Sequence, residues 1–261
     1  MKIWTVDAFA KAPYTGNPAA VTIVAEFPED AICKKIAAEI NLSETAFVKP
    51  LADGTFHIRW FTPLVEVKLC GHATLSAAHI LFQEGYASSR VTLSSLSGPL
   101  TVTKENDGLV LNFPLQKTGP TLPVEAFIEQ LEIDVSIVAA VQAYDDVILE
   151  LENPEALHQL ILDPKDVMKI DCRGLIVTAK GKAPYDFISR FFAPRVGVDE
   201  DPVTGSAHCK LAHYWQQKLN KDSFIAYQAS TRGGEIYITI QQDRVLLKGY
   251  ALTIMEGNWL V

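Results

Sequence analysis

Two stretches of the chain alternate apolar and polar residues in the same way. Leu100, Val102 and Leu109 belong to the first stretch, and Ile236 and Val245 occupy matching places in the second. Alternation with a period of two puts successive side chains on opposite faces of a strand, so both stretches are predicted to form half-buried strands. The match indicates an internal repeat.

Other segments repeat in the same order. An Arg-aromatic-Phe-x-Pro sequence at residues 59–63 recurs at residues 190–194, and we expect the arginine of each copy to have a structural role, paired with a carboxylate. Each copy is followed by a glycine turn and an alanine-rich helical pattern, at residues 70–79 and 204–213. The chain is therefore predicted to consist of two related α/β halves.

The segment before each repeated arginine also has a counterpart. Residues 28–40 are predicted to form a helix, because their apolar positions have helical spacing and a proline and acidic residues stand in the first turn. Residues 46–48 are predicted to form a strand. Residues 164–170 and 175–177 are the expected counterparts in the second half.

The boundary between the halves is expected within residues 117–123, where two prolines and a glycine interrupt any regular element. This gives one half at residues 1–118 and another at 119–261. Many short strands with one substantial helix per half favour an α+β fold, in which a mixed or antiparallel sheet wraps around a central helix. Neither G-x-G-x-x-G nor G-x-x-x-x-G-K-[ST] occurs, so no nucleotide cofactor is expected.

Charge and hydropathy narrow the choice of partners and compartment. The net charge is −8, and lysines and arginines do not cluster, which argues against a nucleic-acid partner. The N-terminal residues alternate and include an aspartate, unlike a secretory signal, and no apolar run approaches the roughly 20 residues that cross a bilayer. We expect a cytoplasmic protein without a membrane partner.

The cysteines do not suggest a disulfide framework or a metal site. The four cysteines are widely spread, without C-x-x-C spacing, and a reducing compartment keeps them as thiols. A zinc site built from Cys70, His72, His208 and Cys209 is disfavoured, because residues so close in sequence rarely bind one ion together. We expect neither a metal nor another cofactor.

The two glycine turns are candidate anion sites. Each is predicted to open a helix, where backbone N–H groups without partners and the helix dipole favour an anion such as a carboxylate. Gly71 and Gly205 permit close approach of the backbone, and His72 and Ser206 add side-chain donors. The alternative is that the glycines serve turn geometry alone and that Ser206 only caps its helix.

Several motifs together resemble the PhzF-like (phenazine biosynthesis PhzF) family over nearly the whole chain. They are Asp7-Ala8-Phe9, Thr15-Gly16-Asn17-Pro18-Ala19, Asn41-Leu42-Ser43-Glu44-Thr45, Cys70-Gly71-His72-Ala73-Thr74 and Asp201-Pro202-Val203-Thr204-Gly205-Ser206-Ala207. The resemblance implies a diaminopimelate epimerase-like fold with two pseudo-symmetric halves, each a barrel-like sheet around a central helix. It also implies an active site at the cleft between the halves, and a homodimer.

The resemblance places Glu44 at the family's catalytic glutamate, and His72, Asp201 and Ser206 at its substrate site, where Asp201 is suited to hold an amino group. A carboxylate shuttles a proton effectively if burial raises its pKa toward neutrality. Glu44 also fits the start of a helix after Asn41 or Ser43. The repeat favours a functional role, because Glu44 falls opposite Arg173 and is therefore unique to the first half.

A two-thiol racemase is disfavoured by the residues of the two turns. Inversion at a carbon requires proton exchange on both faces, which the related epimerase performs with one cysteine from each turn. This chain has Cys70 in the first turn but Thr204 in the second, and a threonine hydroxyl is too weak an acid to replace a thiol. Cys70 itself is either a reactive thiol or, more commonly for cysteine, a buried core residue.

The sequence therefore predicts a cofactor-independent isomerase. Glu44 is expected to move a proton on a small amino-acid-derived carboxylate, which Gly71, His72, Asp201, Gly205 and Ser206 bind. Three alternatives stay open: a racemase or epimerase that uses Glu44 and Cys70, a lyase that begins with the same proton abstraction, and a non-catalytic protein that binds the same small molecules.

Overall fold

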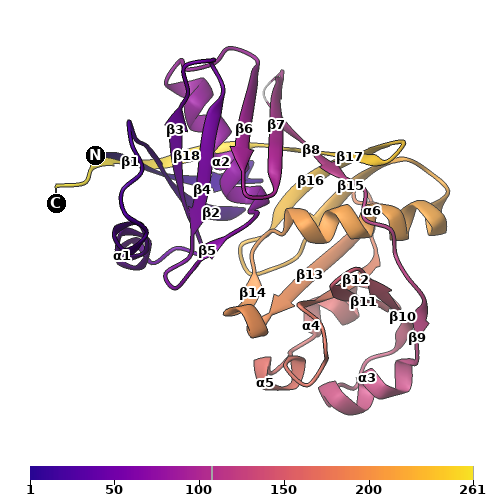
Figure 1. Ribbon diagram of the computed structural model, residues 1–261. Coiled ribbons are helices and arrows are strands. Elements are labelled where there is room, and N and C mark those ends of the chain that lie inside the picture. Colours follow the sequence, from indigo (N-terminus) through magenta and orange to yellow (C-terminus); the bar gives the residue numbers. More distant parts are fainter. Residues whose placement is uncertain (107, 261) are drawn as a thin grey trace. The chain divides into compact units, whose positions relative to one another are not determined.

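The computed structural model describes residues 1–106 and 108–260, so that Asp107 and Val261 lie outside the described residues. The chain forms two compact units: Met1–Phe113 together with the segment that begins at Leu247, and Pro114–Leu246. Figure 1 shows the elements of both units along the chain.

The first unit contains β1 (Lys2–Ala8), β2 (Asn17–Ile23), α1 (Asp30–Ile40), β3 (Thr45–Pro50), β4 (Phe56–Phe61), β5 (Glu66–Val67), α2 (Gly71–Gln83), β6 (Arg90–Ser95), β7 (Gly98–Glu105), β8 (Gly108–Pro114) and β18 (Ala251–Asn258). The second contains β9 (Thr121–Leu122), α3 (Val124–Leu131), β10 (Ile137–Ala143), β11 (Asp146–Leu151), α4 (Pro154–Gln159), α5 (Pro164–Val167), β12 (Gly174–Lys180), β13 (Phe187–Ala193), the 3₁₀ helix η1 (Pro194–Val196), β14 (Val198–Asp201), α6 (Gly205–Leu219), β15 (Ser223–Gln228) and β16 (Gly234–Gln241). The boundary near Leu247 falls inside β17 (Arg244–Gly249).

The strand pairings repeat from one unit to the other. In the first unit β2 pairs with β3 in parallel, β3 with β4 antiparallel, β4 with β6 in parallel and β6 with β7 antiparallel. In the second unit β11, β12, β13, β15 and β16 pair in the same sequence of directions. Both sheets are mixed, as the strand pattern predicts.

A buried helix follows the glycine turn of each unit. The α2 helix buries nine of its residues and the α6 helix buries nine, including polar positions such as His72 and Lys210. Small side chains, chiefly alanine, allow α2 to pack against β1, β2, β3 and β18 on several sides. In Figure 1, α2 lies among the strands of the first unit and α6 beside β15 and β16 of the second. The predicted central helices are confirmed.

The other local predictions hold with different bounds: the helices are shorter than expected, and the strands β3 and β12 are longer. The helix expected at residues 28–40 is α1, which begins at Asp30, whereas the segment at 164–170 forms only the short α5. The repeated arginines pair as expected: Arg59 Nη2 lies 2.7 Å from Glu66 Oε2 and Arg190 Nε lies 2.7 Å from Glu200 Oε1. Each pair holds the strand end that precedes a glycine turn.

The compact units differ from the halves 1–118 and 119–261 in where they place the C-terminal segment. The β18 strand pairs antiparallel with β1 over its whole length, and the Trp259 N–H donates to the Met1 carbonyl at 2.7 Å. This pairing joins segments at opposite ends of the chain, which a repeat of local patterns does not reveal.

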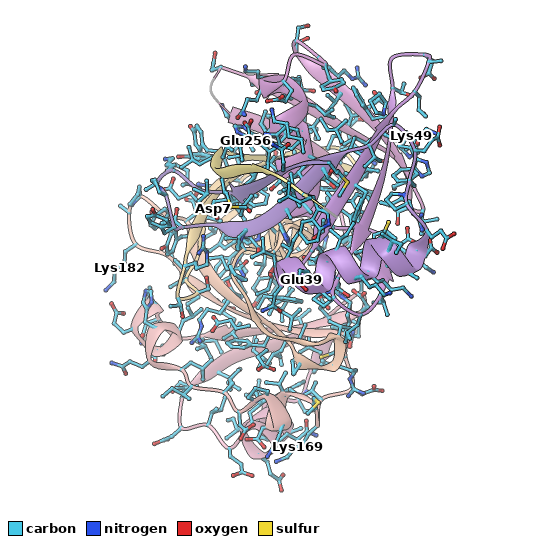
Figure 2. All side chains as sticks on the ribbon, turned by 90° about the vertical axis from the view of Figure 1, so that its left-hand side faces the viewer. Asp7, Glu39, Lys49, Lys169, Lys182 and Glu256 are labelled. Carbon is cyan, nitrogen blue, oxygen red and sulfur yellow. The ribbon has the colours of Figure 1, made fainter. Side chains whose placement is uncertain are left out.

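Two lysine side chains extend outward at the periphery of the second unit. Figure 2 shows Lys169 and Lys182 of the second unit extending away from the ribbon, and their side chains are 47% and 73% exposed. In residues 1–106 and 108–260, no helix combines the length and the apolar character needed to cross a membrane.

Candidate active site

The backbone fixes Glu44 between α1 and a buried strand. Asn41 ends α1 in the left-handed conformation (φ 56°), which turns the chain toward β3. The carbonyl of Glu44 accepts a hydrogen bond of 3.2 Å from the Ala20 N–H, and Thr45, the next residue, is fully buried in the sheet. The side chain of Glu44 therefore projects from a rigid strand end.

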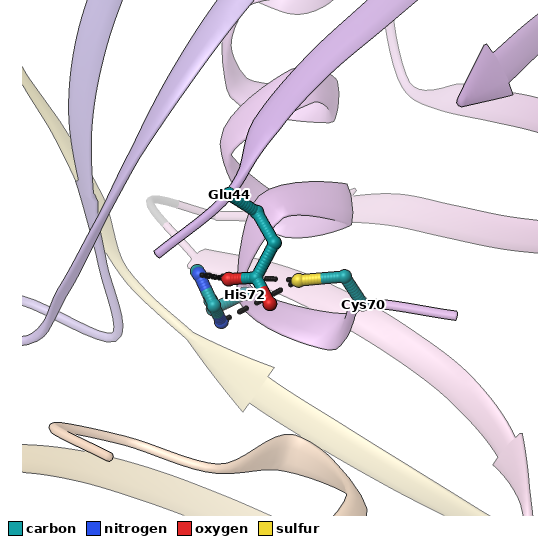
Figure 3. A group of neighbouring side chains, drawn as sticks. All are labelled: Glu44, Cys70 and His72. Atoms are coloured by element: carbon teal, nitrogen blue, oxygen red, sulfur yellow. Dashed lines mark hydrogen bonds and ion pairs between the residues drawn. The ribbon is translucent and has the colours of Figure 1, made fainter. Parts of the chain in front are cut away.

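The Glu44 carboxylate pairs with His72, the second residue of α2 (Figure 3). Glu44 Oε2 lies 3.1 Å from His72 Nε2, and the two side chains are 15% and 7% exposed. The other ring nitrogen, Nδ1, lies 3.1 Å from Asn17 Nδ2, and Ser43 Oγ lies 3.4 Å from Nε2. These contacts from β2 and from the loop before β3 fix the imidazole ring.

Cys70, the residue just before α2, completes the cluster with Glu44 and His72 (Figure 3). Its Sγ lies 3.6 Å from His72 Nδ1 and 3.9 Å from Nε2. Burial raises the pKa of the Cys70 thiol to about 11. Cys70 is therefore a buried, protonated thiol, in agreement with the reading of this residue as part of the core.

The Glu44–His72 pair changes the expected electrostatics of the site. Burial alone raises the pKa of Glu44, but the charge and hydrogen bond of His72 outweigh it, so the pKa of Glu44 lies below its usual range. Burial lowers the pKa of His72, but the charge of the Glu44 carboxylate and the hydrogen bonds of Cys70 and Glu44 outweigh it and hold that pKa above its usual value. The condition named above, a Glu44 pKa raised by burial, is therefore not met in this structure, because a charged partner that the sequence did not reveal lies beside the carboxylate.

Glu44, Cys70 and His72 also have the spacing of metal ligands, since one ligand atom from each lies within 4.8 Å of the others. The other two residues of the zinc set considered above have different surroundings. His208 Nδ1 donates to the Thr204 carbonyl at 2.8 Å, and burial lowers the pKa of its ring to about 4. Cys209 is buried, which raises the pKa of its thiol to about 12.

The second unit holds the remaining predicted residues at the opening of α6. The Asp201 carboxylate accepts a hydrogen bond from the Thr204 hydroxyl, and the Gln228 side chain donates to the Asp201 carbonyl at 2.6 Å. Gly205 and Ser206 are the first residues of α6, and no side chain caps this end of the helix. Ser206 Oγ accepts a hydrogen bond of 3.4 Å from Arg173 Nη2.

Sequence reasoning did not assign roles to several residues that shape these clusters. Asn17 and Gln228 are fully buried polar side chains, and Ser43 reaches His72 from the loop. Buried polar residues on a strand leave no signature in the alternation of apolar and polar positions. Asn17 and Ser43 do belong to motifs quoted above, so the resemblance contained a signal for them that the residue pattern lacked.

The likeness to known proteins covers the whole chain. Residues 6–257 match the family model described as phenazine biosynthesis-like protein, PhzC-PhzF. A protein of Halalkalibacterium halodurans named as an uncharacterized isomerase is 45% identical over 99% of this chain and 98% of its own length. A second protein so named, from Pseudomonas aeruginosa, is 45% identical over 97% of this chain and 96% of its own length.

Solved structures also resemble this chain over nearly its whole length. The crystal structure of a PhzF family protein from Enterococcus faecalis superposes with a TM-score of 0.92 at 38% identity, covering 99% of both chains. A hydroxyproline epimerase from Agrobacterium vitis has a TM-score of 0.65 at 10% identity, over 98% of this chain and 91% of that one, and shares the fold alone. The chain thus has the diaminopimelate epimerase-like fold, is an isomerase, and belongs to the PhzC-PhzF phenazine biosynthesis-like family.

Proposed function

We propose that the enzyme moves a proton on a small amino-acid-derived carboxylate substrate, with Glu44 as the acid/base and without a cofactor. The observation that supports this most directly is the buried pair of Glu44 and His72, 3.1 Å apart at the uncapped N-terminus of α2. A carboxylate, a charged imidazole and backbone N–H groups of a helix end meet there. This set suits abstraction of a proton beside an anionic group.

The pKa directions support Glu44 as the base. A lowered pKa keeps Glu44 deprotonated at neutral pH, ready to accept a proton. When a substrate carboxylate takes over the contact with His72, the largest remaining influence on Glu44 is burial, which raises its pKa. Substrate binding then makes Glu44 a stronger base when a proton must be abstracted.

The proposed step conserves the proton. A C–H bond beside the carboxyl group breaks, and the proton joins a Glu44 oxygen. The electron pair of that bond forms a double bond to the neighbouring carbon, while the pair of the substrate's existing carbon–carbon double bond moves onto the next carbon. The same O–H group then returns the proton to another carbon of the substrate. Gly71 and His72, and in the second unit Asp201, Gly205 and Ser206, are proposed to contact the substrate.

A racemase that uses Glu44 and Cys70 is less well supported. The two bases of such an enzyme must stand on opposite faces of one carbon. Here the Cys70 sulfur and a Glu44 carboxylate oxygen lie within 4.8 Å of each other and contact the same imidazole. The raised pKa of Cys70 also keeps it from acting as a base at neutral pH.

The test is proton NMR in D₂O with a panel of small amino and hydroxy acids, following deuterium uptake at the carbon beside the carboxyl group. We expect uptake with the native enzyme and its loss in Glu44→Gln. Glu26→Gln is the matched control, because Glu26 belongs to the same unit and its side chain is 81% exposed. Compounds that bind the native and Glu44→Gln proteins equally well, without exchange in either, would support the non-catalytic alternative instead.

A further inference from the structure

Arg173 occupies the place in the second unit that Glu44 has in the first. Each residue directly precedes a buried strand, β3 or β12, that pairs in parallel with the strand before it and antiparallel with the strand after it. Each also reaches the second residue of the central helix: Glu44 lies 3.1 Å from His72, and Arg173 Nη2 lies 3.4 Å from Ser206 Oγ. The carboxylate of Glu44 in the first unit thus corresponds to the guanidinium of Arg173 in the second.

The surroundings hold the guanidinium of Arg173 in one orientation. Nη2 donates to Asp146 Oδ2 at 2.6 Å, and Nε lies 3.0 Å from Asp145 Oδ2. The guanidinium carbon lies 5.3 Å from the centre of the Phe191 ring. The side chain is nevertheless 31% exposed. Arg173 is thus ordered in advance and still accessible.

One end of the guanidinium stays available. Nε and Nη2 face the aspartates and Ser206, but Nη1 makes no hydrogen bond to a residue within 1–106 and 108–260. The N–H groups of Nη1 are charged donors that a carboxylate oxygen can accept. They belong to the same planar group as Nη2, which contacts Ser206, a substrate residue already proposed.

A purely structural role is the competing explanation. Lys210 contacts both Asp145 and Asp146, so two cations and two anions form a neutral group, of which Lys210 and Asp146 are buried. In that case Arg173 serves only to balance charge, and lysine at this position satisfies the need. The two explanations differ in whether the open Nη1 donors of Arg173 are needed.

We propose that Arg173 binds a carboxylate of the substrate beside Ser206 and thereby selects for anionic substrates. This inference rests on the proposed function, since it names a further contact to the same carboxylate substrate. It predicts that Arg173→Lys, which keeps the charge but loses the open Nη1 donors, weakens binding of a carboxylate. Loss of one charged hydrogen bond corresponds to about a tenfold to hundredfold weaker affinity.

Succinate and its neutral diamide, succinamide, are the probes. Nitrogen-15 NMR follows the Arg173 side-chain N–H signals, identified by their loss in Arg173→Lys, while either probe is titrated into the native and Glu44→Gln proteins. We expect succinate alone to shift these signals, and its affinity to fall in Arg173→Lys and Arg173→Met. The matched control is Arg195→Lys, since Arg195 belongs to the same unit and binds the Met168 and Ile170 carbonyls.

Succinate titrations that leave the Arg173 signals unmoved, or equal affinity in Arg173→Lys, would overturn the inference. If deuterium exchange depends on Glu44 but its KM is the same in Arg173→Lys as in the native enzyme, the inference about Arg173 is overturned and the proposed function stands. Conversely, succinate binding at Arg173 without exchange of any compound would support the inference and remove the proposed reaction. If Arg173→Met does not fold, the lysine variant still decides.

Discussion

Replacement of His72 by glutamine isolates the charge of the Glu44–His72 pair. A glutamine amide can still donate a hydrogen bond toward Glu44 Oε2, but it cannot carry a positive charge. Breaking a buried ion pair costs about 3–5 kcal/mol. The hydrogen bond that glutamine can keep and the 15% exposure of the Glu44 side chain reduce this cost. At the pH where the pair is most stabilising, we therefore expect His72→Gln to lower the free energy of unfolding by about 2–3 kcal/mol.

The pH dependence of this loss follows from the two pKa directions. In the folded protein the pKa of Glu44 lies below its ordinary value of 4.5. The stabilisation of the fold by Glu44 is therefore complete above pH 4.5 and is lost as the pH falls through the folded pKa. In the folded protein the pKa of His72 lies above its ordinary value of 6.5. The stabilisation of the fold by His72 is therefore complete below pH 6.5 and is lost as the pH rises through the folded pKa. The pair should stabilise the fold most between pH 4.5 and 6.5.

A double-mutant cycle measures this interaction. Urea unfolding of the native protein, His72→Gln, Glu44→Gln and the double variant at a series of pH values gives the coupling free energy between the two side chains. We expect a bell-shaped dependence with its maximum in the stated window. A coupling near zero, or one that does not change with pH, would refute the assignment of a charged pair.

Four further predictions concern neighbouring features. Cys70→Ser should lower the exchange rate no more than about tenfold, as for one weak hydrogen bond, and loss of exchange in D₂O would restore the two-base racemase. Gly16→Ala should lower the free energy of unfolding by at least about 2 kcal/mol. Gly16 has φ +70°, and a Cβ added there would lie 2.2 Å from the Ala8 carbonyl oxygen. A urea midpoint like that of the native protein would contradict this. Dialysis against a chelator should leave exchange intact, since the proposed step uses Glu44 directly, and exchange recovered only with added zinc would contradict it. Sedimentation should show the proposed homodimer, and a monomer at all concentrations would argue against it.

The local part of the fold could be predicted from the sequence because its signals are local. Alternating strands, the glycine turns and the alanine-rich helices each have a pattern within about a dozen residues, and their recurrence revealed the repeated pairings. Pairing of β18 with β1 involves residues at opposite ends of the chain, and no repeated motif marks it. The boundary of the units therefore had to come from the structure.

The same distinction applies to the site. Glu44 and His72 could be identified from the family motifs and from the asymmetry of the repeat. Their mutual contact brings together a strand end and a helix start that lie apart in sequence, and only the distance of 3.1 Å decides the sign of the Glu44 pKa shift. In the sequence, Arg173 is recognisable only as the residue of the second half that corresponds to Glu44 in the repeat. Its contact with Ser206 became known only from the structure.

The pairing of β18 with β1 also sets the order in which the units become complete during synthesis. The second unit is one continuous segment, Pro114–Leu246, whereas the first needs β18 from beyond Leu247. A chain emerging from the ribosome therefore presents every residue of the second unit before the strand that covers the edge of β1. Until then, β1 exposes unpaired backbone groups, a state in which strands tend to aggregate. Nascent chains stalled before β18 are consequently the forms most in need of a chaperone.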